Sequence, residues 1–377
     1  MVGAGVFGAW TARNLLEAGK RVLLIDAWGP AHARASSGGE SRMTRGSYGA
    51  DEVYTRMALD SLPEWRALSE RAELPLFHQI GVLFVFPRPD SFLEDTLRVH
   101  RSLGLPTRLL SGDALRRRIP AMAVGVEDQG LFEPGFGALM ARRAVQSVVA
   151  EFVRAGGTYF EAAVAPPGPG SRLEALATSG GDRIVADEFV FACGPWLGRL
   201  FPDLLATRIF PTRQEVFFFA PDPGDPRFEA GHLPGWADFN GGDVYYGFPD
   251  LEARGFKIAH DAHGPPIDPD IGDRTPSEAA LADVRTFMSR RFPDLADRPL
   301  SEARVCQYEN SSNGDLLIDR HPNLANVLLV GAGSGHGFKH GPAVGRYAAQ
   351  FLLGSLAAVE PRFSLATKAE TAARAVH

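Results

Sequence analysis

The first 26 residues contain the feature that most constrains the fold. Gly3, Gly5 and Gly8 fit the pattern G-x-G-x-x-G, a helical run follows them, and an apolar strand over residues 22–26 ends in Asp26. Such glycines permit a tight turn, a close backbone approach to a pyrophosphate and close helix–strand packing. The pyrophosphate would lie at the helix N-terminus, and the terminal carboxylate would accept hydrogen bonds from ribose hydroxyls. These features in this order predict a dinucleotide site rather than a structural glycine turn.

The strand that should precede the first glycine is short. Only Met1 and Val2 stand before Gly3, whereas a strand typically has about five or six residues. We therefore expect a shortened central strand in the nucleotide domain, and weaker cofactor retention or stability as a result.

The composition excludes several classes of protein. A chain of 377 residues with 45% hydrophobic and 22% charged residues is typical of a globular protein with two domains. A net charge of −6 offers no basic field for nucleic acid or anionic membranes, and no apolar run reaches the roughly 18 residues of a membrane span. Two cysteines, Cys193 and Cys306, cannot form a disulfide framework, and no signal peptide precedes the glycines. We expect a cytoplasmic protein with neither nucleic-acid nor membrane partners.

Hydrophobic periodicity predicts alternating helices and strands. Helices are expected over residues 53–72, 89–103, 139–155, 277–291 and 337–353. Strands are expected over residues 81–86, 184–192, 215–219, 244–248, 303–308 and 327–330. This order predicts an α/β fold, with a Rossmann-like nucleotide domain split along the sequence and an inserted α+β substrate domain built on an antiparallel sheet. The predicted nucleotide domain comprises residues 1–75, 141–208 and 311–377, and the substrate domain residues 76–140 and 209–310.

A second glycine-rich segment, residues 331–337, precedes the last predicted helix. Its N-terminus is suited to negative charge. Lys339 falls in the first helical turn, where a cation opposes the helix dipole. This position indicates that Lys339 serves an external anion such as a ligand carboxylate, the alternative being a solvent-exposed lysine. Arg42 and Arg45, three residues apart, are by themselves explained by a solvated basic face, and Cys193 by a small buried side chain.

Together these stretches resemble the monomeric sarcosine oxidase group, including N-methyltryptophan oxidase, within the D-amino-acid-oxidase superfamily. The shared motifs extend over nearly the whole chain and are the nucleotide fingerprint, S-R-x-x-R at 41–45, Y-Y-G-F-P at 245–249, G-F-K at 255–257, C-x-Y at 306–308 and G-S-G-H-G-F-K at 333–339. The resemblance implies FAD, often linked by a cysteine thioether to the flavin 8α carbon. It also implies oxidation of secondary or primary amino-acid amines by oxygen, with release of peroxide.

The resemblance also implies roles for single residues. Cys306 would carry the flavin, and Tyr308 would lie over its ring. Arg45 and Lys339 would bind the substrate carboxylate. Lys257 would assist oxygen reduction, because an ammonium stabilises the superoxide anion formed in the first step.

The remaining implied roles concern the flavin and the pocket wall. Arg42 and His336 would lie beside the flavin, and Tyr246 would line the pocket. The residues expected nearest the chemistry are Lys257, Arg42, Tyr308 and His336. The full set of expected cofactor contacts is Gly3, Gly5, Gly8, Asp26, Ser41, Arg42, Cys306, Gly333, Gly335, His336, Gly337 and Lys339. We predict no metal site.

Two departures from the family leave the substrate open. Asp261 stands where sarcosine oxidases carry a histidine four positions after the oxygen-activating lysine, with His260 and His263 nearby. The family's histidine before the two arginines is absent from residues 37–39, which read Ser-Gly-Gly. An acid near the amine would suit a more cationic substrate, although Asp261 could instead face solvent.

Other activities stay open at this point. One is a flavin dehydrogenase that passes electrons to a protein or quinone. Another is a nicotinamide reductase, which is disfavoured because neither the C-x-Y motif nor the second glycine segment serves NAD. A third is a non-catalytic flavin-binding protein. We expect a small-molecule amine or amino-acid substrate, oxygen as the second substrate, and a monomer.

Overall fold

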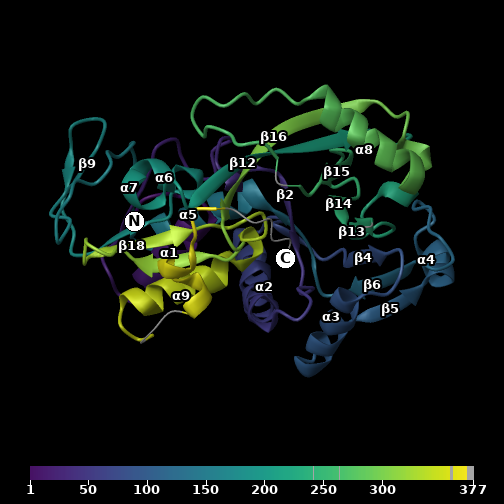
Figure 1. The fold of residues 1–377 in the computed structure, drawn as a ribbon, viewed down its shortest axis with the longest axis horizontal. Coiled ribbons are helices and arrows are strands. Elements are labelled where there is room, and N and C mark those ends of the chain that lie inside the picture. The colour runs from purple at the N-terminus through teal and green to yellow at the C-terminus, as the bar shows by residue number, and fades with distance from the viewer. Residues whose placement is uncertain (241, 263, 357–359, 372–377) are drawn as a thin grey trace.

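The computed structural model describes residues 1–240, 242–262, 264–356 and 360–371 (Figure 1). The molecule is elongated and has two parts. The part at the left of Figure 1 contains helices α1 (Val6–Glu17), α5 (Ala141–Arg154), α6 (Leu197–Leu200), α7 (Pro202–Leu205) and α9 (Gly341–Leu352). The part at the right contains α3 (Ser91–Ser102), α4 (Gly112–Arg118) and α8 (Glu278–Arg291). Helix α2 (Glu52–Ala72) lies between them and contributes side chains to both cores.

The left part is built on a mostly parallel sheet. Strand β1 (Leu23–Asp26) pairs in parallel with β8 (Thr158–Glu161), and β11 (Phe189–Phe191) pairs in parallel with β18 (Val327–Gly331). Val2 forms parallel bridges to Ile25 and to Phe191, so the residue before the glycines joins the two halves of the sheet. Strand β17 (Leu317–Arg320) completes the sheet, antiparallel to β18. Two short strands, β9 (Leu176–Ala177) and β10 (Arg183–Ile184), form a separate pair at one end of the molecule.

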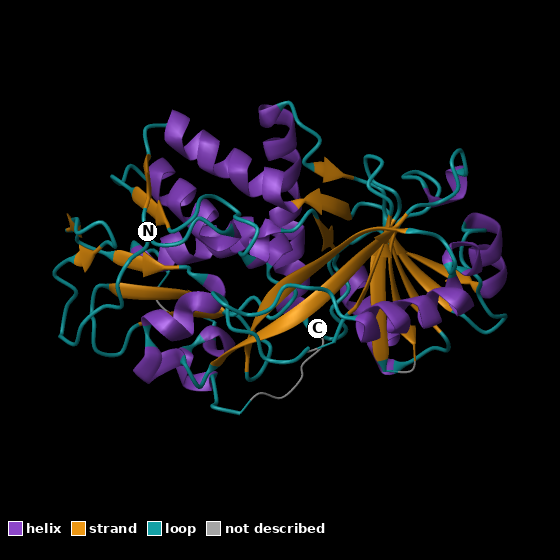
Figure 2. Ribbon diagram, turned by 90° about the horizontal axis from the view of Figure 1, so that it is seen from above, coloured by secondary structure: helices purple, strands orange, loops and turns teal. Residues whose placement is uncertain are grey.

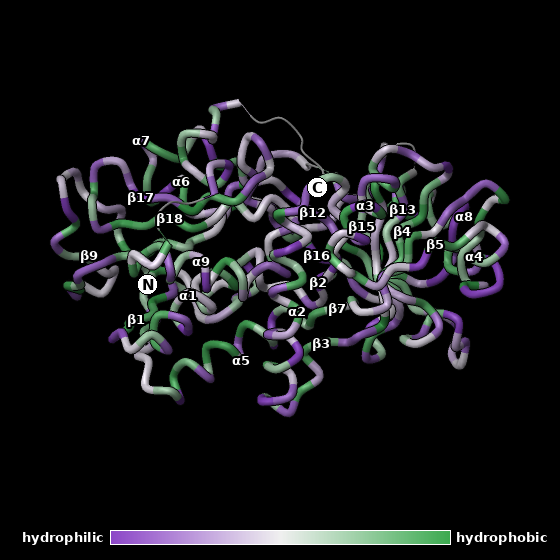
Figure 3. Tube along the Cα trace, turned by 90° about the horizontal axis from the view of Figure 1, so that it is seen from below, coloured by the Kyte–Doolittle hydropathy of each residue, from purple (hydrophilic) through white to green (hydrophobic). Residues whose placement is uncertain are grey.

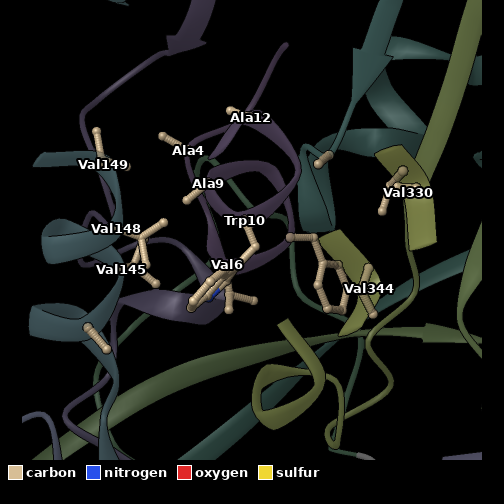
Figure 4. Close-up of a cluster of buried hydrophobic side chains, with 14 of the residues drawn as sticks. Ala4, Val6, Ala9, Trp10, Ala12, Val145, Val148, Val149, Val330 and Val344 are labelled. Carbon is tan, nitrogen blue, oxygen red and sulfur yellow. The ribbon is translucent and has the colours of Figure 1, made fainter. Parts of the chain in front are cut away.

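Helix α1 lies at the centre of the left core (Figure 4). It is buried on nearly all sides because α5 and α9 both pack against it. Trp10, 2% exposed, meets Trp65 of α2 edge to face at 5.2 Å, a contact that contributes roughly 0.5–1.5 kcal/mol beyond its buried area. A Cβ on Gly345 would lie 2.6 Å from the Trp10 backbone, so glycine allows α9 to approach α1 closely.

The right part is a large mixed sheet. Its strand order is β16 (Leu300–Ser311), β12 (Ile209–Phe219), β15 (Phe256–His260), β14 (Asp243–Phe248), β13 (Gly235–Asn240), β4 (Val82–Phe86), β6 (Gln129–Glu133) and β5 (Arg108–Ser111). All neighbours are antiparallel except β13 and β4. Trp236, fully buried, is stacked on Phe256 and on Phe287 of α8. The strands of this sheet include apolar segments, whereas the outer loop around β9 is largely hydrophilic (Figure 3).

The two longest strands connect the parts. β12 and β16 pair from Ile209↔Ser311 to Phe219↔Leu300. They form a long ribbon that extends from the part with the mostly parallel sheet into the large mixed sheet (Figure 2). A third sheet, of order β2–β7–β3, lies near this crossing and consists of β2 (Ser41–Thr44), β7 (Gly137–Met140) and β3 (Phe77–His78). The motifs at 41–45 and 306–308 therefore lie where the parts meet.

The predicted fold class is confirmed, and several predicted boundaries are wrong. The helix expected from residue 139 begins at Ala141, because Leu139 and Met140 pair with β2 and are buried there. Of the strand expected over 184–192, only Phe189–Phe191 belongs to the parallel sheet. The last helix begins at Gly341, after a 3₁₀ turn over Phe338–His340. Lys339 therefore lies in that turn and not in the first turn of the α-helix.

Candidate cofactor and substrate site

The glycine turn before α1 has no room for larger side chains. Gly3 has a φ of +95°, and a Cβ there would lie 2.3 Å from the Ala192 carbonyl oxygen. A Cβ on Gly8 would lie 1.8 Å from the Gly3 carbonyl oxygen. Glycine is therefore required both for the turn and for the packing of α1 against it.

The N-terminus of α1 opens onto a cavity. Gly5 is its N-cap without a side-chain hydrogen bond, and the first turn contains no acidic residue. The Val6 N–H donates to Ser37 Oγ at 3.0 Å. Such an N-terminus carries partial positive charge and can bind a phosphate.

The cavity beside this turn, termed the nucleotide cavity, has a volume of about 320 Å³. Asp26 lines it at the end of β1 and accepts backbone N–H bonds from Ala4 at 2.7 Å, Trp28 at 3.0 Å and Gly29 at 3.1 Å. Trp28 and Trp196, whose ring centroids are 4.8 Å apart, give the cavity an aromatic wall. An aromatic wall, a carboxylate and a helix N-terminus are suited to a base, a ribose and a phosphate, respectively.

A smaller space, termed the connecting cavity, continues from the nucleotide cavity. The two share the lining residues Val6, Phe7, Ser36, Ser37 and Glu309. Three polar atoms on its wall are buried and have no hydrogen-bond partner among the described residues: Ser36 Oγ, Gln307 Oε1 and Glu309 Oε2. Buried polar atoms are seldom left unpaired, so these atoms fit a bound polar group.

A third space, termed the substrate cavity, lies beyond the connecting cavity. Its lining includes the predicted site residues Arg42, Arg45, Tyr246, Cys306, Tyr308, Gly335, His336 and Lys339. It shares Arg42, Tyr308, Ser334, Gly335 and Phe338 with the connecting cavity. The three cavities thus form one path from Asp26 to Lys339, and an elongated dinucleotide such as FAD fits this arrangement.

Two cations, the buried Lys339 and the half-buried Arg45, line one part of the substrate cavity, where both contact Tyr48. The Arg45 guanidinium carbon is 4.0 Å from the centre of the Tyr48 ring, and Lys339 Nζ donates to the Tyr48 hydroxyl at 2.8 Å and to the His336 carbonyl at 2.6 Å. Burial, followed by the nearby Arg45, holds the pKa of Lys339 well below its usual value. Binding an anion would relieve both effects, so this part is suited to a carboxylate.

The lining of the same cavity also includes a carboxylate and two phenols. The Tyr308 hydroxyl donates to Asp261 Oδ1 at 3.1 Å, and Tyr308 also shares a side-chain hydrogen bond with Tyr246. Burial, followed by Asp261, raises the pKa of Tyr246 to about 12 and that of Tyr308 well above its usual value. Both phenols are therefore neutral at physiological pH, and Asp261 lines the cavity rather than facing only solvent.

Cys306 lies beside a guanidinium. Arg42 Nη2 is 3.4 Å from Cys306 Sγ and donates at 2.8 Å to the Ser36 carbonyl oxygen. Cys193 lies in the nucleotide cavity, where burial raises the pKa of its thiol.

Lys257 does not line the substrate cavity. Its Nζ donates to the Ser41 carbonyl at 2.9 Å and to Ser41 Oγ at 3.1 Å, in a small adjacent space closed by Phe218 and Phe248. Lys257 is 3% exposed, and burial, followed by the charge of Arg42, lowers its pKa to about 7. Ser41 thus lies next to Lys257, with Arg42 following it in β2.

Sequence reasoning missed several residues that shape this site. Tyr48 contacts both cations. Glu133, fully buried, accepts from the Gly46 N–H at 3.0 Å and from Ser47 Oγ at 2.5 Å. Arg45 in turn donates to the Ser47 carbonyl. Glu309 follows the C-x-Y motif directly, in a strand rich in polar residues, so its burial gave no signal in the sequence. His263 lies outside the described residues.

The described residues contain neither a metal-binding cluster nor a membrane-spanning helix. None of these residues forms a group of three or more histidines, cysteines or acids that could hold a metal ion. In the same part of the chain, no helix combines the length and apolar character needed to cross a bilayer.

Comparisons with known proteins agree with this geometry. The profile of the family described as FAD dependent oxidoreductase matches residues 1–351. The monomeric sarcosine oxidase of Bacillus sp. (strain B-0618) is 30% identical over 363 residues, covering 94% of this chain and 91% of that protein. The N-methyl-L-tryptophan oxidase of Salmonella heidelberg (strain SL476) is also 30% identical over 363 residues, with 94% of each chain covered. The crystal structure of L-proline dehydrogenase from P. horikoshii has the same fold, with a TM-score of 0.80 at 20% identity over 94% of this chain and 92% of that one.

Proposed function

Because this chain belongs to the family of FAD dependent oxidoreductases, we propose that it oxidises the amine of an amino acid or N-alkyl amino acid to an imine, with reduction of O₂ to H₂O₂. FAD, when bound, would accept the hydrogen and the two electrons removed from the substrate. The observation that carries the proposal is the substrate cavity, whose lining combines Arg45 and Lys339 with Tyr308 and Asp261.

The cofactor would occupy the path of the three cavities. Gly3, Gly5 and Gly8 support this because they open the helix N-terminus, and Asp26 supports it as a ribose acceptor. We propose Cys306 as the covalent attachment point, supported by its place in the substrate cavity beside Arg42. The further proposed contacts are Ser41, Gly333, Gly335, His336, Gly337 and Lys339, of which Gly333, Gly335, His336, Gly337 and Lys339 line the connecting or substrate cavity.

The substrate carboxylate would bind between Arg45 and Lys339. An ammonium has three protons, and Lys339 donates to two protein acceptors, so a third proton is available to the ligand. Anchoring the carboxylate at this end places the amine toward Tyr246, Tyr308 and Asp261. Since amine oxidation mainly requires the C–H bond to be aimed at the acceptor, the residues of the chain act by positioning.

Asp261 gives the amine end of the cavity negative charge. A carboxylate that accepts from Tyr308 can also attract a cationic group of the substrate. We therefore propose that Asp261 favours substrates more cationic than a simple N-methyl amino acid.

Lys257 is the proposed site of oxygen activation. Its support is a buried cation next to Ser41 and within electrostatic reach of Arg42 and Cys306. A fixed positive charge stabilises the anion that forms when oxygen accepts its first electron. The predicted domain division, with residues 1–75, 141–208 and 311–377 binding FAD and residues 76–140 and 209–310 forming the substrate domain, is retained as part of this proposal. A monomeric state and a cytoplasmic location stay predictions.

The test is a screen of purified protein with N-methyl, cyclic, primary and basic amino acids, in which peroxide release and anaerobic bleaching of the flavin are both measured. We expect both signals with the same substrates. Flavin bleaching without peroxide in air would favour a dehydrogenase that uses another acceptor. Absence of bleaching with every amine would refute the proposed reaction.

A further inference from the structure

The connecting cavity contains unpaired acceptors that no role above uses. Glu309 Oε1 accepts from the Gly333 N–H at 3.3 Å, whereas Oε2 has no partner among the described residues. Gln307 Nε2 donates to the Arg34 carbonyl at 2.6 Å, which leaves its Oε1 unpaired in the same part of the chain. Gln307 is 0% exposed and Glu309 is 7% exposed.

The two acceptors share a face of β16. Residues two apart on a strand point to the same side, so Gln307 and Glu309 project together, while Cys306 and Tyr308 project to the opposite side. Cys306 and Tyr308 line the substrate cavity, and Gln307 and Glu309 line the connecting cavity, whose lining also includes Tyr308. One strand therefore contributes both to the part of the site suited to the flavin ring and to the part that leads to the helix N-terminus.

The kind of group that these atoms can bind follows from their chemistry. Two oxygen acceptors require hydrogen-bond donors. An ionised phosphate has none and would be repelled by a carboxylate, whereas a chain of hydroxyl groups supplies several donors. An unpaired carboxylate oxygen is costly to bury, so a ligand hydroxyl at this position would remove a large penalty.

We propose that Glu309, together with Gln307, binds the hydroxyl groups of the sugar-alcohol chain that joins the flavin ring to the pyrophosphate. The order of the lining residues supports this, since Glu309 lies between Asp26 of the nucleotide cavity and Tyr308 of the substrate cavity. Glu309 is thus a cofactor-binding residue, and this inference rests on FAD being the cofactor.

The experiment measures FAD affinity in the full chain carrying Cys306→Ala, so that the flavin is exchangeable. Glu309→Ala should weaken FAD binding roughly 10- to 100-fold, the effect of one charge-assisted hydrogen bond, and Glu309→Gln, which keeps an acceptor oxygen, should lose less. ADP affinity should not change in either variant. Asn310→Ala is the matched control, because Asn310 is a buried polar residue next to Glu309 on the same strand, and it is absent from the lining of all three cavities.

A ligand-side change makes the test specific. FAD analogues that lack one hydroxyl of the sugar-alcohol chain should bind more weakly to the parent protein, and for at least one of them Glu309→Ala should cause no further loss. Equal loss with every analogue in both proteins, or an unchanged FAD affinity in Glu309→Ala, would overturn the inference. A fall in ADP affinity equal to that of FAD would also overturn it, since it would place Glu309 on the adenosine side. Failure of the parent protein to bind FAD would instead refute the cofactor assignment.

Discussion

Replacing Glu309 by glutamine should change how stability depends on pH in the flavin-free protein. Burial raises the pKa of Glu309 from 4.5 to about 7, with hydrogen bonds from Gly333 and Ala332 opposing part of the rise. A carboxyl whose pKa is higher in the folded chain adds stability below its unfolded pKa and loses that stability as the pH rises through the folded pKa. Glutamine has no such dependence and has nearly the same shape.

The magnitude follows from the size of the rise. A change from 4.5 to about 7 corresponds to about 3 kcal/mol at 1.36 kcal/mol per pH unit. The free energy of unfolding of Glu309→Gln, relative to the parent, should therefore rise from near zero at pH 4.5 to about 3 kcal/mol at pH 8. Urea unfolding at several pH values, in the Cys306→Ala background without flavin, measures this difference.

Two controls decide the interpretation. Glu127→Gln changes an exposed carboxylate and should give no comparable difference between pH 5 and pH 8. Addition of saturating FAD should reduce the difference between Glu309→Gln and the parent at pH 8, because a bound hydroxyl would pair with the carboxylate. A difference that does not grow between pH 5 and pH 8 would refute the reasoning that Glu309 is buried with an unpaired oxygen.

Four further predictions concern the proposed catalytic site. Acid precipitation should leave yellow flavin in the protein pellet, and Cys306→Ala should release it; free flavin in the supernatant of the unmodified protein would contradict covalent attachment. Arg45→Ala should raise KM by one to two decades for amino acids, since a charge-assisted pair contributes roughly 1.5–3 kcal/mol, with less effect on amines that lack a carboxylate. Affinity for anionic substrates should also fall as the pH rises through the lowered pKa of Lys339, because only the ammonium form attracts a carboxylate, and Lys339→Gln should abolish this dependence in a KM–pH profile. Lys257→Met should slow flavin reoxidation by about two to three decades and anaerobic reduction far less; stopped-flow measurements that show equal slowing would indicate a positioning role.

Features that depend on residues close together in the chain could be predicted from the sequence. The spacing of Gly3, Gly5 and Gly8 depends on backbone conformation and on contacts within one turn, and the tight turn and close packing expected of these glycines are observed. The helix over 52–72 and the strand over 82–86 likewise follow from local periodicity. Boundaries were wrong where an apolar segment could belong to either element, as at Leu139 and Met140, because the pairing partner in β2 is about a hundred residues away.

The contacts that the site residues make with distant parts of the chain could not be predicted from the sequence. Motif resemblance selected Arg45, Lys339, Cys306 and Tyr308, and the fold brings them to one cavity. It also selected Lys257, which the fold places in an adjacent space against Ser41. Which neighbours a side chain meets depends on strand register and on contacts across more than two hundred residues, and motif spacing contains no information on either.

The sequence by itself therefore determined the fold class, the nucleotide turn and the residue types available for chemistry, since these depend on periodicity, glycine conformation and short motifs. Only the tertiary structure decided which of those groups lose water and which keep a partner. Lys339 meets Tyr48, and Glu309 is buried with an oxygen that has no partner among the described residues, because elements far apart in the chain pack together. Desolvation and charge proximity set the pKa values of Lys339 and Glu309, and both arise only when the chain is folded.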